Sequence, residues 1–265
     1  MSYIGHLDVM RYFQKVIRRA GIPIAFSGGY SPHMIMSFAS PLGLGVTSEG
    51  EYFDIEITEE ISSSEAIARM NATGVEGIEV LSFRRIPSEK KNSGMTILAG
   101  ASYLVFFKES DCGVFLRENI GNRLSSFLEQ SEISILKETK RSKKMVDIKP
   151  FIYELKVREK KEKEKKEDME KQRDTEKQED AKKQESTEKW QDVKAKRDIE
   201  IEMTLAAGSK ENLKPNLVME ALCSTNGIVY KESAYQYHRL EMFANAGDEE
   251  NISLVSLESL GEEIL

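Results

Sequence analysis

Three histidines, His6, His33 and His238, are the residues of this chain best suited to metal or acid–base chemistry. His6 is followed two positions later by Asp8. Imidazole and carboxylate groups together are common ligands of zinc, iron and manganese. These four residues therefore form a candidate metal site, although their spacing is not diagnostic of one. The alternative is that the histidines hydrogen-bond to loop groups or contact a substrate.

Basic side chains recur along the first predicted helix. Arg11, Lys15 and Arg18 lie at positions i, i+4 and i+7, which places them on one face of a helix, and Arg19 is adjacent. This stripe leads toward a glycine-rich segment, where backbone N–H groups are available to bind phosphate. We interpret the stripe as a candidate site for phosphate from RNA or a nucleotide. A solvated helix face without a ligand is the alternative.

The segment FSGGYSPHMIMSFASPLGLGV, residues 26–46, combines glycines, prolines and a histidine with apolar residues that favour burial. Glycine permits positive φ and close backbone approach, and proline stiffens the chain. A shaped loop anchored on a core is expected. Its candidate ligand-binding residues are Ser27, Gly28, Gly29, Tyr30, Pro32, His33 and Ser37, with Arg239 from the distant C-terminal region. Ser27 and His33 do not read as a nucleophile and its base, because no G-x-S-x-G motif is present.

Composition excludes several classes of protein. The 265 residues are 40% hydrophobic and 31% charged, with a net charge of -7, so no overall basic field attracts nucleic acid. The two cysteines, Cys112 and Cys223, are far apart and predict reduced thiols. No apolar run is long enough to span a bilayer. These features predict a soluble cytoplasmic protein that makes no membrane contact.

Helical and strand-like patterns alternate along the chain. Apolar residues at helical spacing predict a helix over residues 7–20, and alternation predicts a strand over 51–58. A further helix is expected to residue 72 and a strand over 78–86. The later strands are expected at 102–108, 133–137, 146–157, 199–206 and 237–243, with helices over 114–129 and from Pro215.

This order predicts an α+β fold made of two ferredoxin-like halves, each with antiparallel sheet and helices on one face. The halves are expected at residues 1–88 and at 100–157 with 199–245. Residues 158–198 form a charged insertion, interpreted as a solvated helix or loop, with an interaction arm as the alternative. Residues 246–265 are expected to be a loosely ordered tail.

The first half departs from this pattern at its start. A ferredoxin-like βαββαβ unit begins with a strand, but this chain begins almost directly on its first helix. We therefore expect one strand-pairing site in the first half to be empty.

The residues GHLDVMRYFQKVIRRAGIPIAFSGGYSPHMIMSFASPLGLGVTSEGEYFDIEI resemble the signature of the radical-SAM-linked protein family. Members of that family are bacterial proteins of uncharacterised function found beside, or fused to, B12-binding radical SAM proteins. The resemblance weakens after about residue 86 and returns at MTLAAGSKENLKPNLVMEAL and at residues 237–241. Most of the chain outside the charged insertion and the tail is therefore covered.

Three differences from the family pattern stand out. Family members usually have about a dozen more N-terminal residues, enough for the absent strand. Many have Pro and Lys after the histidine, where this chain has Met34 and Ile35, so the loop lacks one cation. The charged insertion is also longer than the family pattern.

The resemblance implies a non-catalytic accessory or substrate-presenting module that works with a radical SAM enzyme. Two distant cysteines cannot hold an iron–sulfur cluster, so we expect no cofactor in this chain and a cluster in the partner. The basic stripe adds the hypothesis that the module binds RNA or another phosphate-bearing ligand. The alternative is a small metal-dependent enzyme built on the three histidines and Asp8.

Overall fold

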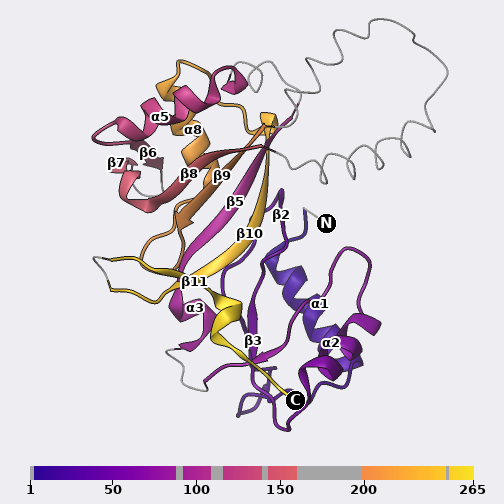
Figure 1. Ribbon diagram of the computed structural model, residues 1–265. Coiled ribbons are helices and arrows are strands. Elements are labelled where there is room, and N and C mark those ends of the chain that lie inside the picture. Colours follow the sequence, from indigo (N-terminus) through magenta and orange to yellow (C-terminus); the bar gives the residue numbers. More distant parts are fainter. Residues whose placement is uncertain (1–2, 88–91, 109–115, 139–142, 160–198, 249–250) are drawn as a thin grey trace, which may run out of the picture. The chain divides into compact units, whose positions relative to one another are not determined.

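A computed structural model describes residues 3–87, 92–108, 116–138, 143–159, 199–248 and 251–265 (Figure 1). The chain divides into two compact units. Unit 1 comprises Met1–Tyr103, Thr204–Leu213 and His238–Leu265, and unit 2 comprises Leu104–Met203 and Lys214–Tyr237. Among the described residues, no helix has the length and apolar character needed to cross a membrane.

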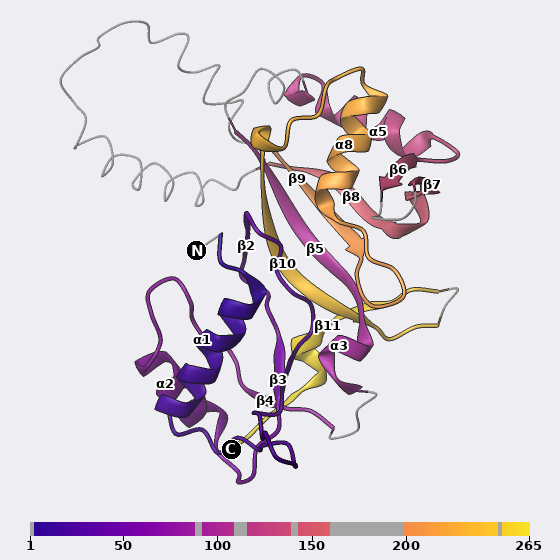
Figure 2. The same ribbon diagram turned by 180° about the vertical axis from the view of Figure 1, so that it is seen from behind.

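Two amphipathic helices form the core of unit 1. Helix α1 spans His6–Arg19 and buries Val16 and Ile17, as the apolar spacing predicted. Helix α2 spans Ser63–Ala72, and the Ser62 hydroxyl caps it by accepting a hydrogen bond from the Glu65 N–H at 3.3 Å. The two helices lie side by side in both ribbon views (Figures 1 and 2). A short helix, α3, follows at Gly94–Ile97.

Short strands complete unit 1. Strand β1 (Met36–Phe38) pairs antiparallel with β3 (Phe53–Ile55). Isolated bridges join Ile24 with Ile57 and Phe26 with Met34. Strand β4 (Arg84–Arg85) pairs antiparallel with β12 (Glu262–Glu263).

A larger sheet has the strand order β11-β10-β5-β9-β8, and β2 also pairs with β10. Its strands β5, β9 and β10 contribute residues to both units. Their burial is nearly continuous in β5 and β9, which is typical of strands covered on both faces. The bounds are β2 Val46–Ser48, β5 Leu98–Phe107, β8 Ile152–Glu159, β9 Ile199–Ala206, β10 Tyr235–Asn245 and β11 Leu254–Ser256.

Unit 2 packs helices α5 (Ile120–Glu129) and α8 (Pro215–Thr225) side by side (Figures 1 and 2). Strands β6 (Ser134–Glu138) and β7 (Lys143–Asp147) form an antiparallel hairpin. Proline at the first helical turn of α8 agrees with the predicted helix start. Fully buried Phe127, Ile148, Ile201 and Leu222 belong to the core of this unit.

The α+β class is confirmed, with five α-helices and several sheets among the described residues. The finer prediction of two ferredoxin-like halves is not confirmed. The expected strand over 146–157 is instead β7 and β8, separated by the 3-10 turn Lys149–Phe151 that contains Pro150. Of the strand expected over 78–86, only β4 forms. Residues 160–198 of the charged insertion lie outside the described residues.

The expectation of a loosely ordered tail differs from what is observed. Residues 251–265 contain β11, the 3-10 turn Leu257–Leu260 and β12. Local composition misled the prediction, because both strands pair with segments distant in sequence.

Candidate functional site

The glycine-rich segment forms a projecting turn at residues 27–33. The Ser27 N–H donates to the His33 carbonyl at 2.9 Å, and the Ile35 N–H donates to the Ala25 carbonyl at 2.9 Å. Gly29 has φ of +100°, a conformation that disfavours side chains. Gly28, Pro32 and the fully exposed Tyr30 occupy the tip. The turn therefore presents an aromatic ring and backbone groups to solvent.

Ser27 and His33 close this turn. The Ser27 hydroxyl lies 2.8 Å from His33 Nδ1 and accepts a hydrogen bond from the His33 N–H at 3.1 Å. Within the described part of the chain, His33 forms no ion pair with a carboxylate that would orient it as a base. This geometry suits a turn that is closed by its own side chains.

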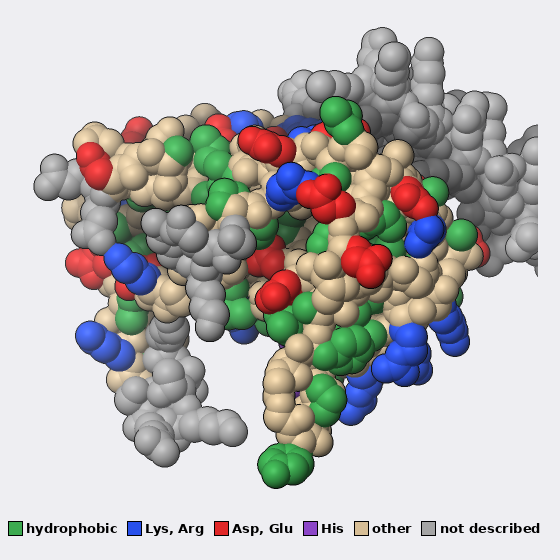
Figure 3. Space-filling model, turned by 90° about the horizontal axis from the view of Figure 1, so that it is seen from below, with side chains coloured by type: hydrophobic (Ala, Val, Ile, Leu, Met, Phe, Trp, Pro, Cys, Tyr) green, Lys and Arg blue, Asp and Glu red, His purple; other side chains and the backbone are tan. Residues whose placement is uncertain are grey.

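The basic stripe occupies the exposed side of α1. Arg11, Lys15, Arg18 and Arg19 are all exposed. Arg11 forms an exposed ion pair with Asp8 at 3.4 Å, which contributes little stability. Lys and Arg side chains gather at one edge of the face shown in Figure 3, apart from the acidic side chains near its centre. The stripe is thus available to an anionic ligand, as the helical spacing predicted.

The candidate metal ligands have separate surroundings. The His6 ring meets the Phe38 ring edge-on, with centroids 5.2 Å apart. His238 Nδ1 lies 2.8 Å from the Thr47 hydroxyl, and its Nε2 lies 3.6 Å from a Glu49 carboxylate oxygen. Across the described ranges, no three His, Cys, Asp or Glu side chains are grouped so that they could hold a metal ion. The structure therefore does not bring His6, Asp8, His33 and His238 together.

Arg239 is an anchor inside unit 1 and is not part of an exposed binding surface. Its side chain is 6% exposed and its Nη1 donates to a Glu51 carboxylate oxygen at 2.9 Å. The same guanidinium donates to the carbonyls of Ser40 and Pro41, each at 3.4 Å, and lies over the Tyr103 ring. Burial raises the pKa of Glu51, and the Arg239 charge opposes that shift.

Ser37 lies on β1 directly opposite Asp54 of β3. It is half-buried within a sheet pair, so it is separate from the exposed tip of the turn.

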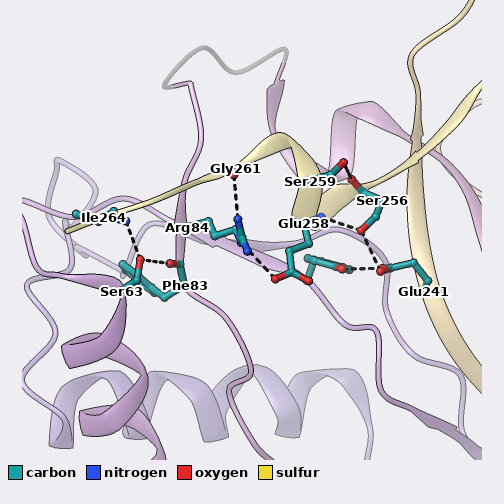
Figure 4. Close-up of polar contacts among 10 residues, drawn as sticks. Ser63, Phe83, Arg84, Glu241, Ser256, Glu258, Ser259, Gly261 and Ile264 are labelled. Atoms are coloured by element: carbon teal, nitrogen blue, oxygen red, sulfur yellow. Dashed lines mark hydrogen bonds and ion pairs between the residues drawn. The ribbon is translucent and has the colours of Figure 1, made fainter.

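A buried polar cluster around Glu241 was not identified from sequence. Tyr52 donates to Glu241 Oε1 at 2.6 Å, and Ser256 donates to Oε2 at 2.9 Å (Figure 4). Burial raises the pKa of Tyr52, and the hydrogen bond to Glu241 raises it further. The alternation of Tyr52, Asp54 and Glu56 was the available signal, since it marks one polar face of a strand.

The C-terminal residues attach to α2 and β4 through matched polar groups (Figure 4). Ser63 donates to the Phe83 carbonyl at 2.5 Å and accepts from the Ile264 N–H at 2.9 Å. Arg84 pairs with Glu258 at 3.2 Å. A side chain at Gly261 would place its Cβ 2.7 Å from the Arg84 Cβ, so this position requires glycine.

Asp54→Asn is expected to make the protein more stable than the wild type at pH 7. Asp54 accepts a hydrogen bond from the Gly94 N–H at 2.8 Å, and asparagine retains an acceptor there. Burial raises the pKa of Asp54, so the folded state binds a proton more readily than the unfolded state does. The stability of the wild type is therefore reduced above both pKa values and recovers as the pH falls through the folded-state pKa.

Urea unfolding at several pH values measures this effect. The advantage of Asp54→Asn should shrink as the pH approaches about 4, near the ordinary pKa of aspartate. A variant that is less stable than the wild type at pH 7 would contradict the assignment.

One family comparison covers most of the chain. The model of a family described as an uncharacterized protein conserved in bacteria (DUF2344) matches residues 1–215. No curated protein and no solved structure matches the chain. Because the family model covers well over half of the 265 residues, the chain belongs to this uncharacterised bacterial family.

Proposed function

We propose that this protein is a non-catalytic accessory module that binds a phosphate-bearing substrate, RNA in the first instance, and presents it to a radical SAM enzyme. The observation that supports ligand binding is the exposed basic stripe of α1, made of Arg11, Lys15, Arg18 and Arg19, in the same unit as the projecting turn. Phosphate contacts of this kind position a nucleic acid without reading its sequence.

The projecting turn supplies what the stripe lacks. Tyr30 is fully exposed, and an exposed aromatic ring stacks on an unpaired base. The Gly28 and Gly29 backbone is also exposed, so its groups can approach a phosphate closely. A single-stranded RNA segment is therefore a better match than a duplex.

Replacing Arg11, Lys15 and Arg18 together with alanine is expected to abolish salt-sensitive RNA binding. Each phosphate contact to a single strand contributes about 0.7 to the slope of log K against log salt, so the loss of three contacts should reduce the slope by about 2. Fluorescence anisotropy with a labelled single-stranded RNA, repeated over a series of salt concentrations, measures both quantities.

The matched control removes the same charge from unit 2. Lys144, Lys214 and Lys231 are exposed, and replacing them with alanine should leave RNA binding unchanged. If the wild type binds no RNA at low salt, the RNA proposal is wrong.

The radical SAM partner is proposed from the resemblance of residues 5–57 to the radical-SAM-linked family signature. Co-purification of this chain with a radical SAM protein encoded beside it tests the pairing. Separate elution of the two proteins at micromolar concentration, with no shift for either, would contradict it.

A further inference from the structure

Strand β3 has one paired edge and one open edge. The Ala39 N–H donates to the Tyr52 carbonyl at 2.9 Å, and the Glu56 N–H donates to the Ile35 carbonyl at 3.2 Å. In an antiparallel pair, backbone groups of successive residues point to opposite edges. The N–H and C=O groups of Phe53 and Ile55 therefore point away from β1.

The same alternation continues past the end of β3. The Ala25 N–H donates to the Glu56 carbonyl, and the Thr58 N–H donates to the Pro23 carbonyl, both at 2.7 Å. Ile57 lies between these bonded positions, so its backbone groups also point to the open edge. Three residues at alternate positions thus present main-chain donors and acceptors along one line.

A second extended segment, residues 78–83, lines the same groove without pairing with β3. The Asn71 side chain binds both backbone groups of Val80, accepting from its N–H at 2.8 Å and donating to its carbonyl at 2.9 Å. A helix side chain thus satisfies Val80, and the edge of β3 that faces the groove has no strand beside it among the described residues.

The floor of the groove is an incompletely covered core. Phe13, Phe53, Ile55, Ile57 and Val80 pack against the buried cluster of α1 and α2 but remain partly exposed. Phe53, Ile55 and Ile57 also share one face of their strand. Burying such side chains is favourable by about 25 cal/mol per Å² of apolar surface. The groove therefore offers an apolar floor directly below an open strand edge.

The rim of the groove is acidic. Exposed carboxylates line it at Glu56, Glu59, Glu60, Glu76 and Glu79. The two arginines that also line the groove, Arg84 and Arg85, pair with Glu258 and Glu60. Hydrophobic side chains lie in hollows between acidic side chains on the face shown in Figure 3.

The size of the groove suits a polypeptide. Its volume is about 2140 Å³, well above the roughly 300–1,000 Å³ typical of small-molecule pockets. An added strand would hydrogen-bond to the open edge of β3 and place alternate side chains on the floor and at the rim.

We propose that unit 1 accepts a β-strand of another protein in the groove between Phe53–Ile57 and residues 78–83, and that this strand alternates apolar residues with Lys or Arg. The apolar residues cover the exposed core, and the basic residues meet the acidic rim. A second copy of this chain is a poorer match, because its net charge is -7. The inference does not depend on RNA binding by α1.

The probe is a fluorescently labelled peptide of about nine residues that alternates valine with lysine. Anisotropy titration of the full chain should show binding that weakens about tenfold or more in the double variant Glu56→Lys, Glu79→Lys. The matched control, Glu118→Lys with Glu129→Lys, makes the same charge change at exposed positions of unit 2 and should bind as the wild type does. Equal weakening in both double variants would overturn the proposal.

Backbone methylation separates strand pairing from charge attraction alone. Only alternate N–H groups of an added strand face β3. N-methylation of one alternate set of peptide residues should abolish binding, whereas methylation of the other set should be tolerated. Tolerance of both sets would overturn strand addition.

The oligomeric state of the wild type tests the competing occupant. If the peptide does not bind and the protein is a dimer that Glu56→Lys with Glu79→Lys dissociates, a second copy fills the groove and the proposal is wrong. These outcomes are independent of the RNA titrations, since the α1 variants leave every groove carboxylate in place.

Discussion

Arg239→Ala is expected to lower the free energy of unfolding by about 3 kcal/mol. The guanidinium of Arg239 is almost fully buried and pairs with Glu51 at 2.9 Å. Its removal leaves the Glu51 carboxylate without its cation and two backbone carbonyls, of Ser40 and Pro41, without their donor. Because the Glu51 side chain is 32% exposed, water partly replaces the lost partner, so we place the effect at the lower end of the range for broken buried pairs.

Urea unfolding at pH 7 measures this loss, and Arg11→Ala is its control. The Arg11 side chain is 68% exposed in its pair with Asp8, so the control should change stability by less than about 0.5 kcal/mol. Adding Glu51→Gln to Arg239→Ala should restore part of the stability by removing the unpaired charge. A loss below about 1 kcal/mol for Arg239→Ala would show that the pair does not anchor this region.

Gly50→Ala is expected to destabilise the protein by about 3 kcal/mol, near the upper end for overpacking. A Cβ at residue 50 would lie 2.4 Å from the Leu240 carbonyl oxygen and 2.7 Å from the Glu241 Cα. Both atoms belong to the backbone of β10, which cannot move aside as a flexible side chain does. The strain would act where the Glu49 N–H bonds to the Arg239 carbonyl at 3.1 Å.

Thermal unfolding of Gly50→Ala should be compared with that of Gly28→Ala. A Cβ at Gly28 would meet no atom within 4 Å, so the same change of residue type there is free of clashes. We expect a large decrease in melting temperature for the first variant and little change for the second. Equal melting temperatures would mean that β10 does not approach residue 50 so closely.

Local patterns predicted the elements whose stability is mainly local. The apolar spacing of residues 7–20 corresponds to α1, and the strand expected over 199–206 corresponds to β9. The helix that follows Ser62 begins with a side-chain cap from that residue. Each of these signals depends on residues a few positions apart, so one sequence is enough to read them.

Long-range pairing was beyond the same reasoning. Arg239 was expected to contact a ligand, but its partner Glu51 is 188 positions away in the sequence. The tail was expected to be loose because of its composition, yet Ile264 bonds to Ser63 across 201 positions. The hypothesis of a metal site failed in the same way, since histidines within one sequence pattern received different neighbours.

The sequence by itself determined the α+β class, the bounds of α1 and β9, the exposed basic stripe and the expectation of an empty strand-pairing site in the first half. Helical and strand periodicities record which face of an element meets the core, and this information is local. Only the tertiary structure decided that Arg239 is an internal anchor, that the C-terminal residues pair with β4, and that β3 presents an open edge above an apolar floor. Those features depend on which distant backbones meet, and no local pattern encodes that choice.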